Sequence, residues 1–104
     1  AALCAAHQAR HASDPHTRAL FAEIAADEAR HAELAWSLDT WLMDQLTPSE
    51  RTLVEAARRA AVRDLINSLD QPFSPELAAL GLPDPATAMH LAAGLDATLW
   101  SLAA

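Results

Sequence analysis

Apolar positions between residues 15 and 46 recur at intervals of three and four, which is the period of an amphipathic helix. No Gly or Pro follows Pro15 in this stretch of about 30 residues, so we expect one helix of roughly 45 Å at a rise of ~1.5 Å per residue. Such a helix suits a bundle, with one seam of side chains facing the interior. The expected seam consists of Phe21, Ile24, Glu28, His31, Ala35, Leu38 and Leu42.

Capping signals divide the rest of the chain into further helices. Asp14-Pro15 and Asp84-Pro85 each place a capping acid before a Pro at the first helical position. Thr47-Pro48-Ser49-Glu50 has the pattern of a capping box. We therefore expect a single helical domain over 1–104, with helices at 1–12, 15–46, 47–69 and 86–104, and a Pro-rich connector at 70–85 that contains one short helical turn from Ser74 to Leu80.

Composition favours one folded, all-α domain. The chain has 104 residues, of which 52% are hydrophobic and 20% are charged, so it is too short for two domains and too apolar for a disordered chain. Val, Ile and aromatic residues are scarce and Tyr is absent, so strands are not expected.

Charge and segment length exclude several kinds of partner. The net charge is −7 and the seven basic residues form no cluster, which argues against a nucleic-acid partner. No apolar run reaches the ~18 residues of a membrane span. The lone Cys4 cannot form an internal disulfide and indicates no compartment. No targeting segment is recognisable, so a cytoplasmic location is the default expectation.

Two ionisable residues, Glu28 and His31, interrupt the apolar seam. Each would cost several kcal/mol if it were buried without a partner. A Glu and a His three residues apart on one inward face can offer a carboxylate and an imidazole to the same metal ion. Three interpretations remain open: a pair of metal ligands, a buried polar network without metal, or a helix whose inward face is not this seam.

The string Ala26-Asp27-Glu28-Ala29-Arg30-His31 resembles the D-E-x-R-H motif of ferritin-like di-iron carboxylate proteins. Residues 1–46 are also similar to bacterial proteins described as ferritin-like domains. The resemblance implies a helical bundle that holds two iron or manganese ions for oxygen or peroxide chemistry, as an oxidase or a ferroxidase. It implies that Glu28 and His31 are metal ligands and that Asp27 holds a ligand His from outside the ligand shell. A solvated acid is the alternative for Asp27.

The family pattern requires a Glu from each of two helices and Glu-x-x-His from each of two others. This sequence contains one Glu-x-x-His. If residues 1–12 and 15–46 form an antiparallel hairpin, Ala1 is level with Glu28, so the lone Glu would lie before the chain begins. We therefore expect the C-terminal part of a longer ferritin-like domain, or a half-bundle that forms a homodimer. The alternative is a metal-free structural or interaction half-bundle that pairs with another chain or a second copy.

The remaining candidates have simpler interpretations. The other histidines and the cysteine are expected at the surface or as small packing residues, the tryptophans in the core by default or otherwise at a subunit contact, and one arginine group on a solvated face with local ion pairs. These residues are His7, His11, His16, His90 and Cys4; Trp36, Trp41 and Trp100; and Arg58, Arg59 and Arg63.

Overall fold

The structure is a computed structural model that describes residues 1–100, and all regular elements within this range are helical. This confirms the expected all-α class. The elements are α1 (Ala2–His11), α2 (Pro15–Gln45), α3 (Pro48–Ser68), α4 (Pro75–Ala79), α5 (Pro85–Leu95) and the π-helical segment η1 (Asp96–Trp100). The expected terminal helix changes to π-helical geometry after Leu95, and residues 101–104 of that expectation lie outside the described part.

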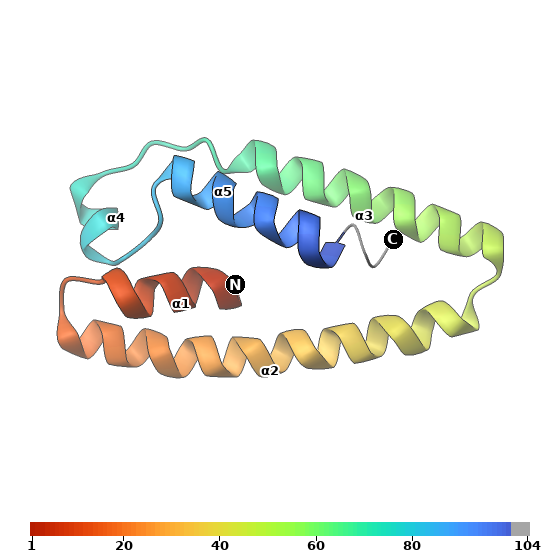
Figure 1. Ribbon diagram of the computed structural model, residues 1–104, viewed down its shortest axis with the longest axis horizontal. Coiled ribbons are helices and arrows are strands. Elements are labelled where there is room, and N and C mark those ends of the chain that lie inside the picture. Colours follow the sequence, from red (N-terminus) through yellow and green to blue (C-terminus); the bar gives the residue numbers. More distant parts are fainter. Residues whose placement is uncertain (101–104) are drawn as a thin grey trace.

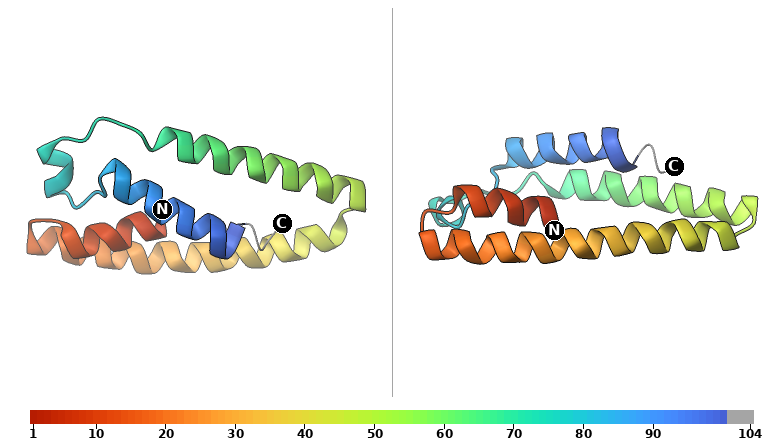
Figure 2. Two further views of the ribbon diagram at one scale, coloured as in Figure 1. Left: turned by 45° about the horizontal axis from the view of Figure 1, so that its top comes forward. Right: turned by 60° about the horizontal axis from the view of Figure 1, so that its bottom comes forward.

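Two helical hairpins share the long helix α2. Helix α1 runs antiparallel along the first half of α2, and α3 returns antiparallel to α2 from the other end (Figure 1). Both views in Figure 2 keep α1 alongside α2, and residues of α5 line cavities with residues of α1, α2 and α3. The molecule measures 49 × 27 × 16 Å, so the helices form an elongated and thin assembly.

Each helix after α1 begins at a side-chain cap. The Asp14 carboxylate accepts a hydrogen bond of 2.8 Å from the Thr17 amide, and Thr47 and Glu50 form a complete capping box. Ser74 and Asp84 cap α4 and α5 in the same way. The amide hydrogen bonds from Thr17, Thr47 and Thr87 hold the pKa values of the Asp14, Glu50 and Asp84 carboxyls below their ordinary range. The helix starts are therefore specified locally by the sequence.

Small residues form the few buried positions. Ala5, Ala12 and Ala92 are buried, together with one polar side chain, Gln8. Because these side chains are short, the backbones of α1 and α2 approach closely. The closest packing between α-helices is between these two. The tight part of the fold is therefore an alanine-lined hairpin.

Large apolar side chains remain largely at the surface. No large side chain is fully buried among the described residues. The accessible surface is 7125 Å², against about 5,700 Å² expected for a folded monomer of 11.1 kDa. The chain thus exposes about 1,500 Å² more than a compact monomer of its mass. The most exposed large apolar residues include Leu20, Leu34, Leu38, Trp41, Leu42 and Leu53.

The connector docks on the turn between α1 and α2. His7 Nδ1 donates to the Gly81 carbonyl oxygen at 2.8 Å, and the Ser13 amide donates to the Ala79 carbonyl oxygen at 2.8 Å. Gly81 has a φ of +78°, and a Cβ at this position would lie 2.5 Å from the Ala12 nitrogen. Only glycine fits both the left-handed backbone and the close approach.

None of the helices in residues 1–100 contains an apolar stretch long enough to cross a lipid bilayer.

Candidate metal site on helix α2

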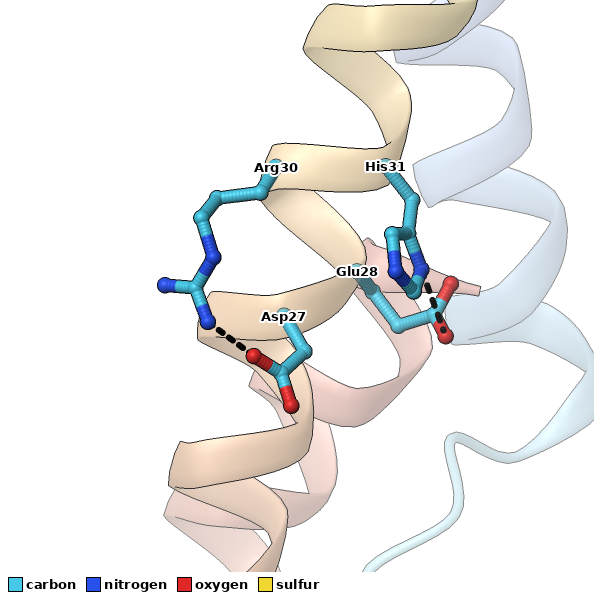
Figure 3. Close-up of polar contacts among 4 residues, drawn as sticks. All are labelled: Asp27, Glu28, Arg30 and His31. Carbon is cyan, nitrogen blue, oxygen red and sulfur yellow. Dashed lines mark hydrogen bonds and ion pairs between the residues drawn. The ribbon is translucent and has the colours of Figure 1, made fainter.

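Glu28 and His31 lie one helical turn apart on α2 and point in the same direction (Figure 3). The Glu28 Oε1 atom lies 3.6 Å from His31 Nδ1. Burial differs between the two, since the Glu28 side chain is 32% exposed and the His31 side chain is 71% exposed. The pair is therefore formed within one helix and is open to solvent on the His31 side.

Asp27 and Arg30 occupy a neighbouring side of the same turn. Their side chains form an ion pair and point away from Glu28 and His31 (Figure 3). Both side chains are more than half exposed. Asp27 therefore pairs with an arginine, in the manner of a solvated acid, and in this chain its carboxylate is not directed at His31.

The seam expected to face the interior lies mostly at the surface. Ile24, Leu38 and Leu42 are 36%, 49% and 50% exposed. The inward face of α2 instead carries alanines, because Ala25, Ala29 and Ala32 line a cavity of about 450 Å³ with residues of α1 and α5. At ~100° per residue, the inward face is rotated from the expected seam by roughly a quarter of a turn. Glu28 lies at the edge of the inward face and His31 lies outside it.

The arrangement provides part of a metal site. A separation of 3.6 Å allows one cation to contact both side chains, because nitrogen and oxygen ligands each bind transition metals at about 2.0–2.2 Å. Within residues 1–100, no group of three or more His, Cys, Asp and Glu side chains could hold a metal ion. A carboxylate and an imidazole suit iron or manganese, but the remaining ligands would have to come from other helices.

The other histidines do not converge on this pair. The rings of His7 and His11 stack with centroids 4.0 Å apart, and His11 Nδ1 donates to the His7 carbonyl oxygen at 2.9 Å. Since His7 donates a hydrogen bond to the Gly81 carbonyl oxygen, both rings are held by hydrogen bonds within the fold. His16 and His90 are exposed and Cys4 is half-buried, so each lies in the kind of environment that the sequence indicates.

Helices α2 and α3 are joined by a polar clamp of Arg58, Asp39 and Trp36. Arg58 forms an ion pair with Asp39, and its guanidinium carbon lies 5.9 Å from the centre of the Trp36 ring. The Arg58 side chain is only 18% exposed, so its placement on a solvated face was wrong. The three residues line a cavity of about 350 Å³ between the helices. Arg58 is 19 residues from Asp39 and 22 residues from Trp36 in the sequence, so no local pattern indicates these contacts.

The tryptophans were expected in the core, and they separate into different environments. Trp36 is half-buried at the clamp, whereas Trp41 is 60% exposed on α2. The core assignment of Trp41 was therefore wrong for the single chain. The side chain of Trp100 lies outside the described part. Trp41 is one of several exposed large apolar residues in this part of α2, with Leu38 and Leu42, and a contiguous apolar patch of this kind marks an interaction surface.

Comparisons with known proteins provide no relative. No protein-family model matches this chain, and no curated protein or solved structure is significantly similar to it. The ferritin-like resemblance of residues 26–31 therefore remains a prediction.

Proposed function

We propose that this chain is one half of a helical bundle that completes its core with another polypeptide. We further propose that the assembled bundle is a ferritin-like protein in which Glu28 and His31 are two ligands of a di-metal centre. The observation that carries the proposal is the position of this pair. The carboxylate and the imidazole lie side by side, with Glu28 at the edge of the inward face and His31 just outside it, on a helix whose large apolar side chains are exposed.

The need for a partner follows from burial. A stable monomer of this size buries large apolar side chains, but among residues 1–99 the buried apolar side chains are those of three alanines. Long helices derive most of their stability from packing of an apolar face. Helix α2 has 31 residues and α1 only 10. Helix α1 covers only the first part of α2, and α3 meets the second part at the Arg58–Asp39 ion pair and Trp36, so the rest of the apolar surface of α2 is free to pack against another chain.

The chemistry of the pair suits a cation. Glu28 provides a negative charge and His31 a neutral imidazole, which together satisfy two positions around a divalent ion. When bound, two iron or manganese ions would supply oxygen or peroxide chemistry. The residues of this chain would hold the ions in place. The methyl side chain of Ala29 on the adjacent inward face leaves space for a packing helix beside the ligands.

A metal-free interaction module is the second candidate. It is favoured by the 71% exposure of the His31 side chain and by the absence of a third donor near the pair among residues 1–100. In this case Glu28 and His31 form a surface ion pair, and the bundle serves only to assemble two chains.

Metal content distinguishes the two candidates. The purified chain is loaded anaerobically with ferrous ion, desalted and measured by elemental mass spectrometry, beside Glu28→Ala and the matched control Glu23→Ala on an exposed turn of the same helix. We expect stoichiometric iron in the wild type and in Glu23→Ala, and its loss in Glu28→Ala. Iron-free wild type, or equal iron in all three proteins, would contradict the ligand role and support the metal-free module.

A further inference from the structure

Helix α2 carries a second apolar row on its outer side, away from α1. The spacing of the row alternates between four and three residues, which is the heptad pattern of helices that pack along a seam. The apolar members are 36% to 60% exposed, and two polar residues occupy the middle of the row. We call this set the outer row: Leu20, Ile24, Asp27, His31, Leu34, Leu38 and Trp41.

We propose that a second copy of this chain covers the outer row, with the two α2 helices antiparallel and a two-fold axis near Arg30 and His31. The outer row is nearly symmetric under reversal about this point. Leu20 of one copy then lies opposite Trp41 of the other, and Ile24 opposite Leu38. A self-complementary surface of this kind is what an isologous dimer requires.

The polar middle of the outer row sets the register. In the antiparallel pairing, Asp27 of one copy lies within about one turn of Arg30 of the other, because each is displaced only a few residues from the axis. The Asp27–Arg30 ion pair of the single chain can thus be exchanged between copies at little electrostatic cost. A parallel pairing places Asp27 directly against Asp27 along the seam, whereas the antiparallel pairing places Asp27 against Leu34, so repulsion between like charges opposes only the parallel pairing.

The exposed area is sufficient for a stable dimer. The excess over a compact monomer is spread over the whole surface. At about 1,500 Å² per chain, or about 3,000 Å² in two copies, it sets an upper limit on the area that a dimer would bury to reach the surface of a compact protein. Obligate homodimers bury roughly 2,000–5,000 Å² in total, and crystal-type incidental contacts less than about 800 Å². The observed surface therefore fits a permanent partner of the same size better than a transient contact.

The same pairing would bring two Glu28–His31 pairs together, and this part of the inference rests on the proposed function. His31 lies almost on the two-fold axis. Glu28 lies about 4 Å from that axis, measured along the helix at ~1.5 Å per residue. The dimer would supply the second Glu-x-x-His that a single chain lacks. Self-association itself does not depend on metal binding.

The first test is the molar mass of the purified chain in solution, measured by sedimentation equilibrium. We expect a dimer of twice 11.1 kDa for the wild type. Leu34→Glu should weaken the dimer at least 100-fold, because Leu34 lies in the outer row. The control Leu53→Glu alters a leucine on α3 that is 71% exposed, against 60% for Leu34, and should leave the dimer intact. A monomeric wild type, or equal effects of the two substitutions, would overturn the proposal.

The second test determines the orientation by disulfide cross-linking in a Cys4→Ser background. Leu20→Cys and Trp41→Cys chains, mixed and oxidised, should form a mixed cross-link, because an antiparallel pairing brings these positions together. Cross-linking of Leu20→Cys only with itself would indicate a parallel dimer and overturn the antiparallel arrangement.

The two proposals fail in different ways. If the chain forms a dimer that binds no iron, the dimer proposal stands and the metal-site proposal is contradicted. If the chain is a monomer that binds iron, the metal-site proposal stands and the dimer proposal is contradicted.

Discussion

The amide nitrogen of the Gln8 side chain on α1 donates a hydrogen bond of 3.2 Å to the carbonyl oxygen of Leu80, 72 positions later in the chain. Gln8 is the buried polar side chain of the structure, and its carbonyl oxygen lies 3.7 Å from the Cys4 sulfur. A buried amide without partners would be costly, so this hydrogen bond ties the connector to the α1–α2 hairpin. The connector is thus part of the packed structure.

The docking of the connector predicts a large effect of Gly81→Ala. The added Cβ would lie within 3 Å of the backbones of Gln8 and Ala12, and the φ of +78° strains any other residue. We expect a loss of at least ~2 kcal/mol in the free energy of unfolding, measured by urea denaturation. Gly94→Ala is the control. It meets no atom within 4 Å in α5, and should stabilise the chain by up to ~1 kcal/mol.

The clamp between α2 and α3 predicts unequal roles for adjacent arginines. Arg58→Ala removes a partly buried ion pair with Asp39 and the contact with Trp36, and should cost about 1–2 kcal/mol of stability. Arg59→Ala alters an exposed side chain and should change stability by less than ~0.5 kcal/mol. Thermal unfolding followed by tryptophan fluorescence measures both. Equal melting temperatures for the two variants would show that the clamp is not stabilising.

The helix caps predict loss of helicity in acid. Hydrogen bonds from the backbone amides lower the pKa of Asp14, Glu50 and Asp84 in the folded chain. Their stabilisation is therefore complete above the pKa of an unfolded carboxyl, about 4, and is lost as the pH falls through the lower folded values. Circular dichroism between pH 5 and pH 2 measures this.

Asp14→Asn with Asp84→Asn is the corresponding variant. Asparagine caps helices without ionising, so the double variant should lose less helicity over the same range. Acid profiles that coincide with that of the wild type would contradict the role of these caps.

His31→Leu separates metal binding from assembly. Because His31 is exposed in the single chain, the substitution should change the stability of the monomer by less than ~0.5 kcal/mol. It places an apolar residue in the middle of the outer row, so the dimer should tighten several-fold while bound iron is lost. Sedimentation equilibrium and elemental analysis on one sample give both results. Iron content equal to that of the wild type would remove His31 from the ligand set.

The sequence predicted the helix starts well, because each depends on neighbouring residues. Asp14, Thr47, Ser74 and Asp84 all act as caps where the pattern places them. The sequence predicted less well which face of α2 points inward. Large apolar residues dominated the pattern, whereas the hairpin packs through alanines such as Ala25, whose small side chains permit close approach. Hydrophobic periodicity gives little weight to that effect.

Contacts distant in sequence were not predictable. The Arg58–Asp39 ion pair depends on how α2 and α3 lie relative to one another, and no motif encodes this. The Glu28–His31 pair was predictable because both residues share one turn of α2. The exposure of the pair was not, because it depends on how the other helices pack around α2.

The contact between the Ser13 amide and the Ala79 carbonyl oxygen also constrains the order of folding. It closes a loop of about 66 residues, and for a flexible chain the entropy of that closure would cost roughly 3–4 kcal/mol. Helices α2 and α3 reduce the loop to two stiff rods and a short turn, so closure costs far less once they have formed. Docking of the connector is therefore a late event in folding, and the hairpin of α1 and α2 must be in place to receive it.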